Sequence, residues 1–134
     1  MDNVARRGRK ARMTMNIATF SPHAYYDKAQ DHLRVELRDC SITEERINGH
    51  LTMLRDNYPG PGQDDCAGLM IEGVSTLFTD LEIHHYSFLA AFLGAVIERL
   101  PRDPVNARLI RPVQQLAANI EIPVRLQNLE VARA

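Results

Sequence analysis

The side chains best suited to chemistry in this chain are its five histidines, some of which stand four residues from a carboxylate. His32 precedes Glu36, and Asp80 precedes His84, so each pair would share one face of a helix. Helical bundles build metal sites from such pairs on facing helices. The sequence lacks both the repeated Glu-x-x-His motif and the HExxH motif of known metal sites. We therefore predict no metal site and no cofactor, and a helix-stabilising role for both pairs.

Two cysteines, Cys40 and Cys66, are the other candidate reactive groups, and both stand beside acidic residues. Cys40 follows Asp39, and Cys66 follows the Asp64-Asp65 pair. A nucleophilic thiolate requires an electropositive setting, which these carboxylates oppose. Two cysteines also do not make a disulfide framework in a chain of this length. We therefore predict reduced thiols, no catalytic residue and no enzymatic activity.

Positive charge is concentrated in residues 1–12, which contain five cations and one acid. The cations are Arg6, Arg7, Arg9, Lys10 and Arg12. Residues 13–134 contain 11 basic and 16 acidic residues. An arm of this kind contacts nucleic-acid phosphates without sequence preference, and its lack of aromatic residues argues against base stacking. Nucleic-acid binding through the arm is the alternative function, beside a solvated tail or an upstream extension without a structural role.

Negative charge dominates the middle of the chain, because no Lys or Arg occurs from residue 64 to residue 98. The acids that define this region are Asp64, Asp65, Glu72, Asp80 and Glu82. An acidic surface can dock on a basic partner protein, although an ordinary solvated face is the other interpretation. We predict that these five residues contribute to an acidic surface that binds a partner protein.

The fifteen residues from Ile83 to Ile97 contain no Lys, Arg, Asp or Glu. They predict most of a helix that is apolar on nearly every side, and such a helix is buried in a core or in a subunit interface. Ala90 and Gly94 stand four residues apart within it, a spacing that lets another helix approach closely. We expect this helix to be the central element of the fold or the seam of a homodimer.

The remaining apolar spacing predicts an all-α fold, a compact bundle of about five helices. The expected helices span residues 21–39, 41–58, 65–78, 79–100 and 103–120. Their capping signals include capping boxes at Ser41–Glu44 and Thr79–Glu82, and Asp103 followed by Pro104. One long helix over 65–100 is an alternative to the third and fourth. Pro112 predicts a kink or a division of the last helix. Residues 120–126 form either an edge strand paired with residues 13–17 or a short helix from Pro123.

These observations predict a basic arm at residues 1–12 followed by a single helical domain at residues 13–134. Without an apolar segment long enough to span a membrane or a signal peptide, we expect a cytoplasmic protein that does not bind membranes. The predicted function is a non-catalytic protein-binding module. Small proteins of this size and composition include adaptors, and inhibitors encoded by mobile elements, that occupy the surface of a partner.

Overall fold

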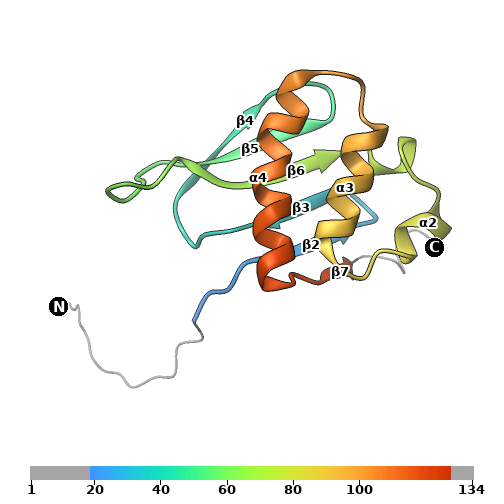
Figure 1. The fold of residues 1–134 in the computed structure, drawn as a ribbon, viewed down its shortest axis with the longest axis horizontal. Helices are drawn as coiled ribbons and strands as arrows, with labels where there is room; N and C mark the ends of the chain where they lie inside the picture. Colours follow the sequence, from blue (N-terminus) through green and yellow to red (C-terminus); the bar gives the residue numbers. More distant parts are fainter. Residues whose placement is uncertain (1–18, 128–134) are drawn as a thin grey trace.

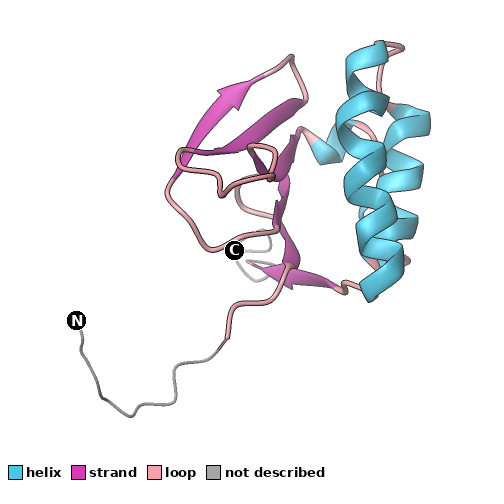
Figure 2. Ribbon diagram, turned by 60° about the vertical axis from the view of Figure 1, so that its left-hand side comes forward, coloured by secondary structure: helices cyan, strands magenta, loops and turns pink. Residues whose placement is uncertain are grey.

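The computed structural model describes residues 19–127 and shows an α/β fold, with helices on one face of a single sheet (Figure 1 and Figure 2). The strands are β2 (His23–Asp27), β3 (His32–Glu36), β4 (Ile42–Arg46), β5 (Leu51–Asp56), β6 (Cys66–Glu72) and β7 (Val124–Gln127). The helices are α2 (Asp80–His84), α3 (Leu89–Arg99) and α4 (Pro104–Ile120), with a short 3₁₀-helix, η1, at Val74–Thr76. The prediction of an all-α helical bundle is therefore wrong.

The six strands lie in the order β4-β5-β6-β3-β2-β7. Neighbouring strands are antiparallel except β2 and β7, which are parallel. The chain leaves the middle of the sheet after β6, passes through all the described helices, and returns as β7 at the far edge. The sequence allowed either an edge strand or a short helix near Pro123. The structure shows the edge strand, β7, which pairs with β2. Residues 13–17, the expected partner, lie outside the described residues.

The first predicted helix is the β2–β3 hairpin. Its apolar residues are close enough together to fit a helical stripe, but they also alternate with polar residues as on a strand. Ala24, Tyr26, Leu33 and Val35 all point to one face, where each is almost fully buried. The apolar pattern of two short strands can also fit one helix, so the pattern alone does not distinguish the two structures. The distinction depends on the layer of helices that covers this face of the sheet.

Asp31 fixes the turn of this hairpin. Its backbone has a φ of 55°, in the left-handed region that Asp tolerates better than most residues. Its carboxylate accepts hydrogen bonds from the Tyr26 hydroxyl at 3.0 Å and from the Ser75 backbone N–H at 2.9 Å. The turn is thereby tied to η1 on the other side of β6.

The second predicted helix is also a hairpin, formed by β4 and β5. Asn48-Gly49, a strong hairpin signal, lies between these strands, and the Asn48 side chain accepts the backbone N–H of Leu51 at 3.0 Å. The predicted capping box at Ser41 does not form. Instead, the Ser41 hydroxyl accepts a hydrogen bond from Asn57 across the hairpin at 2.9 Å.

The third predicted helix is replaced by β6 and η1. Gly68 lies in β6, where an added Cβ would stand 2.0 Å from the backbone oxygen of Val35 in β3. Gly73 precedes η1 with a φ of 69°. Both glycines therefore serve close strand approach and a left-handed turn rather than helix packing.

The predicted fourth helix is divided into α2 and α3 by residues 85–88. The capping box at its start is confirmed: the Thr79 hydroxyl accepts the Glu82 N–H, and the Glu82 carboxylate accepts the Thr79 N–H. The predicted start of the last helix is confirmed as well, with Asp103 as N-cap and Pro104 in the first turn. The predicted division of that helix is wrong, because α4 continues through Pro112.

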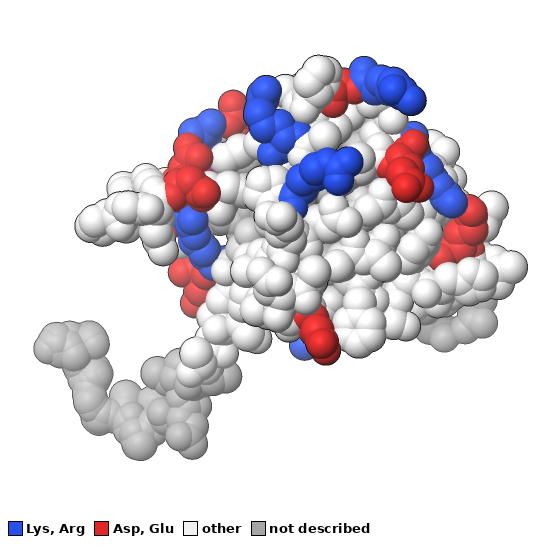
Figure 3. Space-filling view, viewed as in Figure 1, with Lys and Arg blue, Asp and Glu red and all other residues white. Residues whose placement is uncertain are grey.

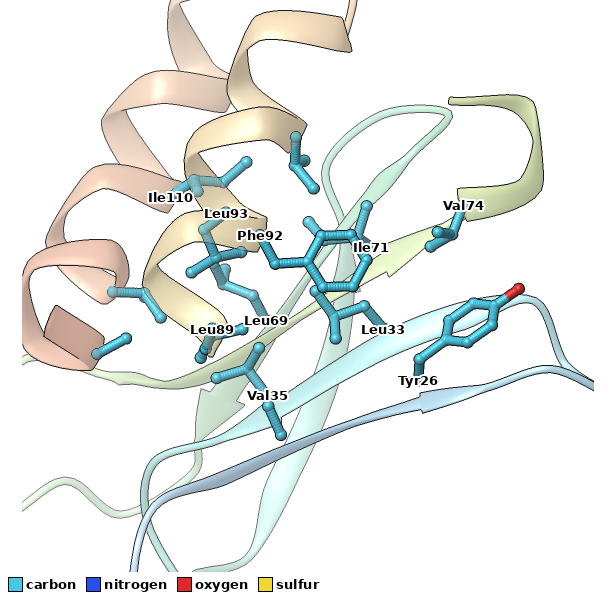
Figure 4. Packing of buried hydrophobic residues seen from close by; sticks show 14 of the residues in the cluster. Tyr26, Leu33, Val35, Leu69, Ile71, Val74, Leu89, Phe92, Leu93 and Ile110 are labelled. Atoms are coloured by element: carbon cyan, nitrogen blue, oxygen red, sulfur yellow. The ribbon is translucent and has the colours of Figure 1, made fainter. Parts of the chain in front are cut away.

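The main core lies between the sheet and the two long helices, α3 and α4. In Figure 4 the Phe92 ring of α3 lies against Leu33 and Ile71 of the sheet. Within the Ile83–Ile97 segment, the buried residues of α3 follow helical spacing: Leu89, Phe92, Leu93 and Val96. This segment therefore packs on a sheet and not at the centre of a bundle.

None of the helices in residues 19–127 has the length and apolar content that crossing a bilayer requires.

Candidate binding groove

A groove of about 460 Å³ lies between α4 and the sheet, where β5 and β6 meet the segment that follows β3. Its α4 wall contains Arg108, Leu109, Pro112, Val113 and Leu116. The opposite wall contains Leu37, Arg38, Met53, Asp64, Asp65 and Cys66. The volume is within the range of about 300–1,000 Å³ that is usual for ligand sites.

Helical spacing places the apolar residues of α4 along the groove. Leu109, Val113 and Leu116 follow one another at intervals of four and three residues, so they form one stripe on the helix. Leu116 is 36% exposed although it lies in this stripe, and Ile120, one turn further on, is 48% exposed. Met53 of β5 faces the stripe from the sheet and is buried. The groove is therefore apolar inside and remains open towards the C-terminal half of α4.

Two arginines pair with the acids at the rim of the groove, and each arginine is shared by two carboxylates. Arg38 donates to Asp56 at 3.1 Å and to Asp64 at 2.9 Å. Arg55 forms ion pairs with Asp65 and with Glu45 of the neighbouring strand β4. These contacts hold the loop between β5 and β6 against the sheet, because they join Asp64 to the segment after β3 and Asp65 to β5.

Asp56 is the most buried carboxylate of this group. The backbone N–H of Tyr58 and the guanidinium of Arg38 lower the pKa of Asp56 below its ordinary value. The charged form is thus the one that the fold stabilises. An Asp56 carboxylate held in its charged form by these donors is poorly suited to act as a general acid or a general base.

The thiol of Cys66 lines the groove but is not activated. Burial is the largest effect on its pKa, which is raised, and its sulfur donates to the Gly68 carbonyl at 3.6 Å. Burial is also the largest effect on the raised pKa of Cys40, with Asp56 adding to it. Both cysteines are free thiols. Their environments favour the protonated, unreactive form.

Arg108 differs from the other charged residues of the groove because it has no partner among the described residues. It is exposed, and it forms no ion pair or hydrogen bond within residues 19–127. Pro112, one turn further along α4, has no N–H to donate to the carbonyl of Arg108. The α4 wall thus presents a charge without a counterion and a carbonyl that lacks its usual helical donor.

The structure separates the five acids that were predicted to form a partner-binding surface. Asp64 and Asp65 lie together at the groove rim, as described above. Glu72 lies at the end of β6, where it accepts a hydrogen bond from Thr52 at 2.8 Å and pairs with Arg46 at 2.6 Å. Each of these acids already has a basic partner from another element.

The other two acids, Asp80 and Glu82, lie together on α2. Asp80 pairs with Lys28, and Glu82 pairs with Arg99 at 3.1 Å. Partner binding by these acids stays a prediction, as does binding of nucleic acid by the basic arm, whose residues lie outside the described part of the chain.

Ala90 and Gly94 lie on the side of α3 that faces α4. The Gln114 amide of α4 donates to the Ala90 carbonyl at 3.3 Å, and an added Cβ on Gly94 would stand 3.0 Å from the same amide nitrogen. The small side chains thus allow α4 to approach α3 within one chain. A homodimer through this segment stays a prediction.

The histidines lie away from the groove. His23 pairs with Glu36 at 3.4 Å on the sheet face opposite the helices, and His32 contacts the Tyr25 ring there at 6.4 Å between centroids. His84 is exposed on α2. Across residues 19–127, no three His, Cys, Asp or Glu side chains stand close enough together to hold a metal ion.

Sequence reasoning missed the groove almost entirely, apart from the rim acids Asp64 and Asp65. The available signal is the stripe of Leu109, Val113 and Leu116 in the predicted helix over residues 103–120, which a helical bundle would bury. Its position beside an arginine without a partner depends on how α4 lies on the sheet.

Comparison of the chain with protein-family models, with curated proteins and with solved structures found no match in any of the three.

Proposed function

We propose that this protein is a non-catalytic binding module, an adaptor or inhibitor that holds a segment of a partner polypeptide in the groove beside α4. The observation that carries the proposal is the groove itself, which combines an apolar interior with a charged rim. Binding sites typically have this composition, since apolar contacts supply affinity and a few polar groups supply orientation. The unactivated thiols and the neutralised carboxylates support binding over catalysis.

A polypeptide segment suits this groove better than a compact small molecule. The apolar stripe of α4 extends past the groove to Leu116 and Ile120, both of which are exposed. An elongated occupant can follow such a stripe and place successive apolar side chains along it, as in other grooves that bind peptides. Asp64 and Asp65 then contribute to the rim, where their paired arginines keep them in place. A cytoplasmic location, consistent with two free thiols, is part of the proposal.

Selection from a phage library of random peptides of about twelve residues tests the proposal. Wild-type protein is the bait, and each enriched peptide is then measured by fluorescence anisotropy against two variants. Leu116→Lys places a charge in the groove. Leu81→Lys is the matched control, because Leu81 is an exposed leucine on α2 that lies outside the groove.

We expect peptides that bind wild type and Leu81→Lys equally and lose at least about tenfold in affinity with Leu116→Lys, because a lysine in an apolar site must be desolvated. Circular dichroism of both variants establishes that they are folded. The proposal is refuted if no peptide is enriched, or if the enriched peptides bind Leu116→Lys as tightly as wild type.

A further inference from the structure

The charges around the groove differ in whether the protein itself neutralises them. Asp64 and Asp65 already have arginine partners within the protein, so a cation of an occupant would compete with Arg38 or Arg55 for them. Arg108 on the α4 wall has no counterion within the described residues. An occupant that supplies a carboxylate at Arg108 adds an ion pair without breaking one.

A second arginine strengthens this preference. Arg108 and Arg111 are the two basic residues of α4, they stand three residues apart, and Arg111 is also exposed and without a partner in residues 19–127. Figure 3 shows basic side chains over the N-terminal half of α4, while the C-terminal half carries no charged residue. Along its exposed surface, α4 thus passes from two arginines without a partner in the described residues to an uncharged C-terminal half.

We propose that the segment held in the groove is acidic and amphipathic, with Asp or Glu beside its apolar side chains, and that Arg108 selects it. This inference rests on the proposed function. The apolar side chains of the segment lie against Leu109, Val113 and Leu116, and a carboxylate reaches the Arg108 guanidinium. The charge preference is thus opposite to the one predicted from the acidic middle of the sequence, because those acids already have basic partners, whereas Arg108 has none within the described residues.

Arg108 is expected to determine specificity as well as affinity, because its guanidinium favours a segment that supplies a carboxylate.

The peptides enriched on wild type in the library selection supply the first test. We expect them to contain an excess of Asp and Glu next to Leu, Ile, Phe or Met. The best peptide is then synthesised in its selected form and with every acid replaced by Lys, and both are measured at low and at physiological salt. The selected form should bind at least about tenfold more tightly, and the difference should shrink as salt screens the charges.

Variants of the protein identify the residue responsible. Arg108→Gln should weaken the acidic peptide about tenfold, whereas Arg102→Gln should change its affinity less than about twofold. Arg102 is the matched control because it is also exposed and unpaired in the described structure but lies outside the groove. Arg108→Glu should reverse the preference, so that the Lys-substituted peptide binds more tightly than the acidic one. A purely structural role of Arg108 does not produce such a reversal.

Neutral or basic peptides whose binding depends on Leu116 overturn this inference and leave the proposed function intact. Acidic peptides that bind Arg108→Gln and wild type equally also overturn it. A selection without any peptide that depends on Leu116 refutes the proposed function and the inference together.

Discussion

Replacing Gly68 by Ala tests the strand arrangement directly, because the sheet and the helical bundle predict opposite effects. In the structure, the new Cβ stands 2.0 Å from the backbone oxygen of Val35 and 3.2 Å from the Leu54 side chain. Ordinary Cβ contacts lie at 3.4–4 Å, so β3 and β6 must separate by more than an ångström. In a helix interior the same replacement would instead stabilise the protein by about 1 kcal/mol.

The expected cost follows from what the separation disturbs. Overpacking in a close-packed region costs about 1–3 kcal/mol, and each weakened backbone hydrogen bond between β3 and β6 adds about 0.5–1.5 kcal/mol. The lower backbone entropy of unfolded Ala returns only about 0.5–1 kcal/mol. We therefore expect a net loss of about 3 kcal/mol or more, a large part of the roughly 5–15 kcal/mol that stabilises an ordinary domain. The melting temperature should fall by roughly 10 °C.

Urea denaturation followed by circular dichroism measures this loss, and an unchanged slope with urea shows that the folded and unfolded states are otherwise comparable. Gly49→Ala is the control. Gly49 lies in the β4–β5 turn with nothing within 4 Å of its added Cβ and without a positive φ, so its replacement should cost less than about 0.5 kcal/mol. Equal stability of Gly68→Ala and wild type, or a gain, would refute the close approach of β3 and β6.

Three further changes follow from the described contacts. Asp56→Asn should lower the free energy of unfolding at neutral pH, because the Tyr58 N–H and the Arg38 guanidinium hold the folded pKa of Asp56 below its ordinary value of about 3.9. In urea titrations, the difference in stability between variant and wild type should shrink as pH falls below about 4, where Asp56 of the wild type becomes protonated. A constant difference down to pH 2 would contradict this. Gly94→Leu should cost about 1–3 kcal/mol, because the new side chain displaces Gln114 between α3 and α4; an unchanged urea midpoint would show that this side of α3 is free. Thr79→Ala should cost about 1 kcal/mol through loss of the capping box, whereas Thr79→Ser should retain most of it in the same assay.

The strands illustrate why the fold class was predicted wrongly. The apolar residues of β2, β3 and β5 stand in groups short enough to fit both a helical and an alternating pattern. Asn48-Gly49 was the local signal that could have decided in favour of a hairpin. Gly68 gave no such signal, because its role depends on the backbone of β3, which lies more than thirty residues away in sequence.

Only a few residues of the candidate groove could be recognised from the sequence. Asp64 and Asp65 were recognised as acids, but their neutralisation by Arg38 and Arg55 arises from strand pairing. Arg108 gave no signal in the sequence, because an arginine on a helix is ordinary until the structure shows that the other charged residues of the groove have partners. The tertiary structure thus changes the expected charge of the binding partner.

Features that depend on a few neighbouring residues could be predicted correctly from the sequence. These are the capping box at Thr79, the start of α4 at Asp103, and the presence of a helix within the apolar segment from Ile83 to Ile97. Such signals act through hydrogen bonds and side-chain spacing within a turn or two of helix, so they are readable without the rest of the chain. The sheet, the groove and the lack of a partner for Arg108 within the described residues became visible only in the tertiary structure. Strand pairing and ion pairing join residues that are far apart in sequence. They contribute to stability only when the fold brings those residues into contact.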